Sequence, residues 1–198
     1  MYFGKVFVSG GAVLCFSAFC LLVSGELLFI TLIAGFVHEL GHYLALRLLG
    51  GKITEFRLES TGAAIIYEGS SMSYMAELLA ALAGPIFSFV HAYICALIGK
   101  RFGEFWFTLS GVSLVLCVFN LLPATLLDGG RVLHMLLAHL LDADSAEKIC
   151  FAVSCLVSLC MMLTGLWLLL RTGWNFTLLV SGVWLFIGTA IVKRRVWV

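Results

Sequence analysis

Charged residues are scarce in this sequence. Only 12 Lys and Arg and 11 Asp and Glu occur among 198 residues, a charged fraction of 12%. Soluble globular domains carry about 25% charged residues, whereas 62% of this chain is hydrophobic. The composition therefore excludes an ordinary soluble domain and predicts an all-α polytopic membrane protein in contact with the lipid bilayer. The formal net charge of +1 gives no sign of a nucleic-acid partner.

The sequence also lacks paired cysteines. Its seven cysteines all lie in apolar stretches, their number is odd, and none forms a Cys-x-x-Cys pair. We therefore interpret them as small buried hydrophobic residues and not as a disulfide framework or a thiol metal site. A small-residue cleavage site is likewise missing between Lys5 and Glu26, so the first apolar run is expected to be a retained helix and not a signal peptide.

Long apolar runs are abundant. A membrane-spanning helix needs about 20 residues, and six runs approach or exceed that length. They cover residues 6–24, 27–48, 77–99, 105–122, 149–170 and 174–192. We therefore predict about six transmembrane helices in a single domain over residues 1–198, without a further C-terminal domain.

Residues 51–73 differ from these runs. The stretch from Lys52 to Glu59 alternates apolar and polar residues, which is the period of a β-strand. Strand-forming residues follow from Thr61 to Tyr67, and Gly69-Ser70-Ser71 predicts a loop. A small hairpin or strand pair is expected after the second helix.

The basic residues predict the orientation in the membrane. With six spans and the N-terminus inside, nine Lys and Arg lie on the cytoplasmic side and three on the outer side. The three outer residues are Lys100, Arg101 and Arg171. This asymmetry favours a multi-pass protein of a cell membrane with both termini in the cytoplasm.

The chemistry is concentrated in His38-Glu39-Leu40-Gly41-His42, inside the second apolar run. Residues i and i+4 share a helix face, so His38 and His42 can bind one metal ion. Glu39 is offset from them and can act as general base on a water molecule. Ionisable groups at membrane depth cost about 2.5–3.5 kcal/mol each on insertion scales. A pair of packing histidines is therefore a poor alternative to a zinc site.

Zinc needs a third protein ligand, and Asp128 is the main candidate. Pro123 should end the fourth span near residue 122, which leaves Asp128 in an irregular segment ahead of a new helix. The alternative is that Asp128 is only a helix N-cap, and the residues do not decide between the two. His91 is expected to be a hydrogen-bonded interior histidine, and His134 and His139 to lie on an amphipathic or interfacial helix. Both His42 and Asp128 are expected at similar depth, towards the cytoplasm.

Three segments resemble a known family, the site-2 proteases of family M50, and within it the bacterial branch of sporulation factor IV FB. The resemblance rests on His38-Glu39-Leu40-Gly41-His42, on Asn120-Leu121-Leu122-Pro123 with Leu127-Asp128-Gly129-Gly130-Arg131, and on Ala83-Gly84-Pro85. The two prolines of the chain lie in the last two motifs. Where the family commonly has Asn after the third motif, this chain has Ser88. Many members of the branch also carry a nucleotide-sensing CBS domain, which this sequence does not contain.

The resemblance implies roles for individual residues. His38, His42 and Asp128 would bind one Zn²⁺, Glu39 would activate water, and Asn120 would support the substrate or transition state. The substrates would be transmembrane or membrane-tethered proteins, with regulatory membrane proteins as further partners in a bacterial cell membrane. We therefore predict an intramembrane zinc metalloendopeptidase. The alternatives are a catalytically idle regulator and a zinc-binding transporter or sensor without protease activity.

Overall fold

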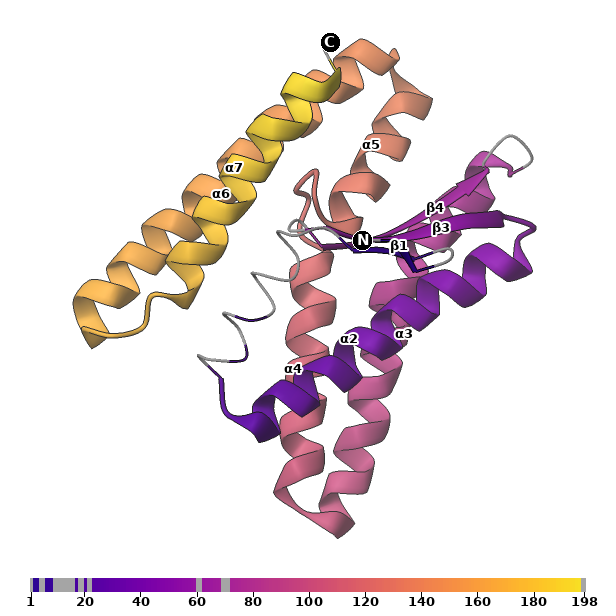
Figure 1. Ribbon diagram of the computed structural model, residues 1–198. Helices are drawn as coiled ribbons and strands as arrows, with labels where there is room; N and C mark the ends of the chain where they lie inside the picture. Colours follow the sequence, from indigo (N-terminus) through magenta and orange to yellow (C-terminus); the bar gives the residue numbers. More distant parts are fainter. Residues whose placement is uncertain are drawn as a thin grey trace. The chain divides into compact units, whose positions relative to one another are not determined.

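The computed structural model describes residues 2–3, 6–8, 17, 20, 23–59, 62–68 and 72–196. These residues contain six helices and four strands (Figure 1). The chain divides into two compact units, residues 1–119 and 120–198. Each unit is described in its own right below.

Three long helices of the first unit lie within the described residues, and their ends follow from local sequence. Helix α2 spans Gly25–Leu48 and begins at Ser24, whose Oγ accepts a hydrogen bond from the backbone N–H of Leu27 at 3.4 Å. Helix α3 spans Tyr74–Phe102 and is capped in the same way by Ser73. A glycine at φ +96°, Gly103, ends α3, and α4 follows over Glu104–Asn120. These helices match the predicted second, third and fourth spans.

The core of this unit lies between α2, α3 and α4. Ile30 and Ala34 of α2, Cys95 of α3 and Leu109 of α4 form one buried cluster, each at most 2% exposed. The cluster members on α2 are four residues apart and therefore share one helix face. Partly buried side chains surround the cluster: Ile33, Phe105, Trp106, Val112 and Leu116.

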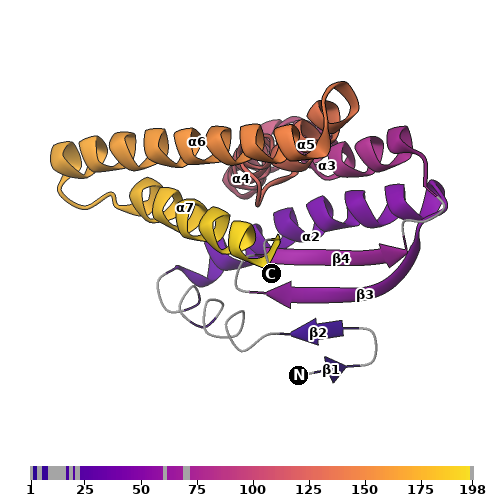
Figure 2. The same ribbon diagram turned by 90° about the horizontal axis from the view of Figure 1, so that it is seen from above.

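A four-stranded sheet accompanies the helices of the first unit. The strands are β1 (Tyr2–Phe3), β2 (Val6–Val8), β3 (Lys52–Glu59) and β4 (Gly62–Glu68), in the order β1-β2-β3-β4 (Figure 2). Strand β3 pairs antiparallel with β4, with Phe56 opposite Ile65. The segment predicted as a hairpin or strand pair therefore forms two paired strands.

One boundary of the predicted first span is wrong. Residues 6–8 belong to strand β2 and not to a helix that starts at residue 6. They pair in parallel with Phe56–Leu58 of β3, about 50 residues further along the chain. The run Val-Phe-Val suits a strand as well as an apolar helix, so this long-range pairing decided its conformation. Most of the remaining predicted span, and the predicted loop at residues 69–71, lie outside the described residues.

The second unit consists of α5 (Asp128–Leu140), α6 (Ala143–Thr172) and α7 (Thr177–Val196). Helices α6 and α7 run antiparallel and pack side by side along their length (Figures 1 and 2). Asp142 caps α6 by accepting a hydrogen bond from the backbone N–H of Ser145 at 2.8 Å. The side-chain hydrogen bond of Ser145, and then this backbone bond, lower the pKa of Asp142. Gly173, at φ +76°, ends α6.

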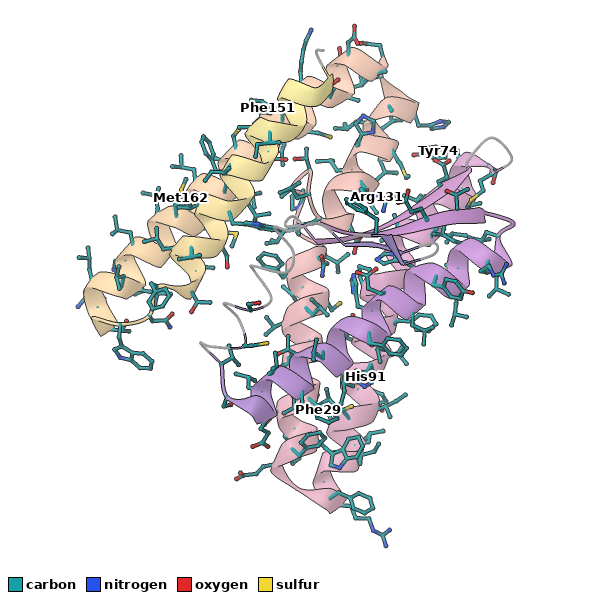
Figure 3. All side chains as sticks on the ribbon, in the orientation of Figure 1. Phe29, Tyr74, His91, Arg131, Phe151 and Met162 are labelled. Atoms are coloured by element: carbon teal, nitrogen blue, oxygen red, sulfur yellow. The ribbon has the colours of Figure 1, made fainter. Side chains whose placement is uncertain are left out.

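Length and apolar character suit a membrane environment. Among the described residues, α2, α3 and α6 are each long and apolar enough to cross a bilayer, and α4 and residues 177–191 of α7 are shorter apolar helices. Many large apolar side chains are exposed on these helices; Phe29 of α2, labelled in Figure 3, is 57% exposed. Lipid is the medium in which such surfaces are stable. The predicted all-α membrane fold class is confirmed, while the number of six spans stays a prediction.

The buried cluster of the first unit generates a test of this packing. We expect Ile30→Ala to destabilise the protein by on the order of 2 kcal/mol or more, because Ile30 is 1% exposed and its truncation leaves a cavity. Leu32→Ala is the matched control, since Leu32 lies on the same helix and is 48% exposed. Thermal unfolding in detergent should show a clear loss for the first variant and little change for the second. Equal losses would contradict the assignment of this helix face to the core.

Candidate metal centre

Two buried histidines face each other on one side of α2. His38 and His42 are 5% and 8% exposed, and their Nε2 atoms lie 3.2 Å apart. Their rings are nearly perpendicular, with an interplanar angle of 81° and centroids 4.9 Å apart. The helical spacing of four residues produces this juxtaposition, as the sequence predicted.

The other ring nitrogen of each histidine is held by α3. His42 Nδ1 lies 2.8 Å from the backbone carbonyl oxygen of Ala80. Because a carbonyl can only accept, His42 Nδ1 carries the hydrogen and Nε2 keeps its lone pair. His38 Nδ1 lies 2.9 Å from Ser88 Oγ. Both Nε2 atoms are thus oriented to the same point by hydrogen bonds on the far sides of the rings.

Two glycines allow α2 and α3 to approach at this point. A Cβ on Gly41 would lie 2.7 Å from the Ala83 carbonyl oxygen and 2.8 Å from Phe87 Cβ. A Cβ on Gly84 would collide with the imidazole ring of His42. Pro85 follows at once and has no N–H for the carbonyl of residue 81, so the backbone ladder of α3 is interrupted beside the Ala80 carbonyl. The glycine of each motif thus makes room for the other helix.

The pair fits a tetrahedral metal ion. Two nitrogens at about 2.0–2.1 Å from one zinc ion, at the tetrahedral angle, lie about 3.3 Å apart. The observed Nε2 separation of 3.2 Å matches that value. Metal-binding histidines also typically donate their second ring N–H to a carbonyl or other acceptor, as His42 does here. Glu39 is half-buried and follows His38 on the helix, so it is offset by about 100° of helix rotation from His38 and by about 60° from His42.

Ser88 is the residue at this centre that the sequence argument did not assign. It is fully buried in α3 and contacts His38 across the helix interface. One signal was available, because Ser88 follows Gly84 by four residues and so lies on the same face of α3. This spacing places Ser88 on the same face of α3 as Gly84, but it does not show that His38 lies opposite Ser88.

Asp128 lies in the second unit, as the first residue of α5. The N-cap of α5 is Leu127, and no side chain caps this helix end. The alternative in which Asp128 is a helix N-cap is therefore wrong, since Asp128 is already helical. Asn120 is the last residue of α4. Its predicted role near the site stays a prediction, as does the role of Asp128 as third ligand.

The segment ahead of Asp128 is irregular but well anchored within its unit. The backbone N–H of Thr125 donates to Ser154 Oγ of α6 at 2.9 Å, and Thr125 Oγ1 donates to Thr189 Oγ1 of α7 at 3.3 Å. A Cβ on Gly129 would collide with the backbone carbonyl of Leu121. Non-helical backbone at membrane depth needs such internal partners, because lipid supplies none. The start of α5 is thus fixed by α6 and α7.

The predicted role of His91 as a hydrogen-bonded interior histidine is confirmed. Its Nδ1 lies 2.9 Å from Ser113 Oγ of α4, and its Nε2 lies 3.4 Å from Cys95 Sγ (His91 is labelled in Figure 3). Such polar contacts between apolar helices strengthen their association. His134 and His139 lie on α5, within a predicted helical region. The six cysteines that the structure describes are free thiols.

Comparisons with known proteins agree with one another. Residues 98–163, which include Asn120 and Asp128, match the model of Peptidase family M50. A curated zinc metalloprotease of Methanocaldococcus jannaschii is 29% identical over 176 residues, which cover 86% of this chain and 49% of the relative. The chain thus spans about half the length of that relative.

A solved structure shares the fold. The site-2 protease from Methanocaldococcus jannaschii matches with a TM-score of 0.72 and 23% identity, over 96% of this chain and 92% of that one. This likeness shows the fold, and the match of residues 98–163 to Peptidase family M50 supports the resemblance to that family. Its narrower part, the sporulation-type bacterial branch, stays a prediction.

The close approach at Gly84 generates a test of the centre. Gly84→Ala should displace the His42 ring, because the added methyl group would occupy the place of the ring. We expect metal content after purification to fall at least several-fold while helicity is kept. Gly35→Ala is the control, since a Cβ at Gly35 on α2 meets no atom within 4 Å. Full metal content in the Gly84 variant would show that the histidines do not bind in this arrangement.

Proposed function

We propose that this chain is an intramembrane zinc metalloendopeptidase of the site-2 protease type. The observation that carries the proposal is the buried histidine pair, with Nε2 atoms 3.2 Å apart and both Nδ1 atoms held by α3. Two imidazoles fixed in this way, next to a glutamate in one helical motif, have the donor set of a hydrolytic zinc centre. The similarity to a curated zinc metalloprotease supports the same activity.

His38 and His42 would hold the ion through Nε2, and we propose Asp128 as the third ligand. Two observations support this role. Asp128 is a carboxylate at the start of α5, and the segment before it is anchored on Ser154. Three protein ligands leave one position open, as in other catalytic zinc sites. When bound, zinc supplies Lewis acidity for the scissile carbonyl and the attacking water.

Glu39 would move the proton. It follows His38 in α2, and the glutamate of an H-E-x-x-H motif serves as general base and not as a ligand. Its carboxylate would accept the proton of the attacking water and then donate it to the nitrogen of the leaving amine. The peptide bond is thereby cleaved with one water consumed. Asn120 is proposed as support for the substrate or transition state.

The proposed substrates are transmembrane or membrane-tethered proteins in a bacterial membrane. The active site and both termini would face the cytoplasm, as the asymmetry of Lys and Arg favours. A substrate helix must unwind locally before cleavage, because its own hydrogen bonds shield the peptide bond. Strand β4 is a suitable partner for the extended substrate, since it pairs with β3 on one side and is the last strand in the order of the described sheet.

Two other functions make different predictions. A zinc-binding transporter or sensor would not need Glu39, because that residue is not a ligand. A catalytically idle regulator would keep the fold without peptidase activity. The presence of Glu39, His38, His42 and Asp128 argues against this alternative. A role in sporulation follows from the branch resemblance alone, and a stress or housekeeping protease agrees equally well with the sequence.

Co-expression with candidate single-span or membrane-tethered substrates tests the mechanism. Glu39→Gln should lower cleavage by about 100- to 10,000-fold, the range typical of lost acid–base catalysis, while zinc content stays at the wild-type level. Asp128→Ala should lower both cleavage and zinc content. Cleavage that persists in Glu39→Gln would exclude the proposed proton transfer. Normal zinc affinity in Asp128→Ala would exclude that residue as a ligand.

Substitutions in β4 test the strand-addition proposal. Ile65→Thr and Ile66→Thr keep strand propensity and should change the ratio of cleavage rates for two different substrates. Zinc content should not change, because β4 supplies no proposed ligand. The measurement is paired cleavage of both substrates together with metal analysis of each purified variant. A parallel loss of zinc, or an unchanged substrate ratio, would argue against strand addition.

A further inference from the structure

The hydrogen bond between Ser88 and His38 is a polar contact that the proposed mechanism has not used. Ser88 is 0% exposed and lies on α3, and its Oγ is 2.9 Å from His38 Nδ1 on α2. A buried hydroxyl without a hydrogen-bond partner lowers the stability of the fold by about 1–3 kcal/mol, so a serine buried at this point needs a hydrogen bond. The contact joins the two helices that build the histidine pair.

The two histidines have different kinds of partner. The Ala80 carbonyl can only accept from His42 Nδ1, which fixes the lone pair of His42 on Nε2. The Ser88 hydroxyl can donate or accept. His38 Nδ1 can therefore be either donor or acceptor at this contact, depending on which nitrogen of His38 carries the hydrogen.

This freedom is useful because the two Nε2 atoms are only 3.2 Å apart. Two lone pairs at this distance repel, so in one arrangement His38 Nε2 carries the hydrogen and donates to His42 Nε2. Ser88 then donates to His38 Nδ1. In the other arrangement, in which both Nε2 atoms would hold an ion, the hydrogen of His38 would be on Nδ1 and the Ser88 hydroxyl would accept it. A carbonyl in place of Ser88 could satisfy only the second arrangement.

From this geometry we propose that Ser88 is a positioning residue for His38, which holds the imidazole with its Nε2 lone pair available for the metal ion. The inference rests on the proposed function and adds a residue to it. An Asn side chain could serve in the same way, because its amide offers both a donor and an acceptor. Ser88 itself contacts neither substrate nor metal in this role.

The test compares two side chains of equal shape. Ser88→Thr keeps the hydroxyl, and Ser88→Val replaces it by a methyl group of the same volume. The zinc dissociation constant of the full chain in detergent is measured by competition with a chelator of known affinity. We expect Ser88→Val to bind zinc about 10- to 100-fold more weakly than Ser88→Thr, the usual effect of losing such a hydrogen bond to a ligand. Ser88→Asn should bind as Ser88→Thr does.

A matched control exists in the same unit. Ser113 is 0% exposed and lies 2.9 Å from Nδ1 of His91, a histidine outside the pair, while its hydroxyl donates to the Leu109 carbonyl. Ser113→Val should leave zinc affinity unchanged. The visible absorption of the Co²⁺-loaded protein supplies a second readout, and it should change in Ser88→Val and not in Ser113→Val. Ser88→Ala, which adds no volume, should reproduce the loss of affinity if Ser88→Val does not fold.

The outcomes separate this inference from the proposed function. Equal zinc affinities and equal Co²⁺ spectra for Ser88→Val and Ser88→Thr, with wild-type binding intact, would overturn the positioning role alone. The same holds if Ser113→Val weakens zinc as much as Ser88→Val, because the effect would then be one of general packing. A wild-type chain that binds no zinc would overturn the proposed function and the inference with it.

Discussion

The contact between α2 and α3 through two imidazole rings is the interaction on which the first unit depends. Ionisable groups inside an apolar helix are costly unless every polar atom finds a partner. Here α3 supplies those partners from its backbone at Ala80 and its side chain at Ser88. The requirement extends to the glycines, because Gly41 and Gly84 bring the helices close enough for the hydrogen bonds. The motif around His38 and the motif around Gly84, more than 40 residues apart in the chain, therefore pack against each other at one helix contact.

The second unit solves a similar problem for an irregular segment. The chain between α4 and α5 leaves the helical hydrogen-bond pattern at Pro123 and must satisfy its backbone by other means. Ser154 of α6 and Thr189 of α7 supply these contacts, and Gly129 lets the start of α5 fold back against Leu121. Helices α6 and α7 thus fix the backbone that leads into Asp128. Within each unit, glycines allow the close approach of backbone segments, and Ser and Thr hydroxyls form hydrogen bonds with the buried polar groups.

Prediction from sequence succeeded where a local pattern was sufficient. The length of the apolar runs gave α2, α3, α4, α6 and α7 to within a few residues, except that α6 begins six residues earlier than the predicted span. Alternation gave the strands β3 and β4. The spacing of His38 and His42 gave their shared face. Prediction from sequence failed for residues 6–8, because a Val-Phe-Val run is compatible with either a helix or a strand.

The sequence by itself determined the membrane class, the positions of most helices and the identity of the histidine pair. The class follows from composition, the helix positions from the length of the apolar runs, and the histidine pair from the 3.6-residue period of a helix. Only the tertiary structure decided that Val6–Val8 pairs with β3, that Asp128 is the first residue of α5 and not its N-cap, and that Ser88 lies against His38. Each of these depends on which backbone or side chain lies opposite. Local spacing cannot specify that, since it is set by the packing of segments far apart in the chain.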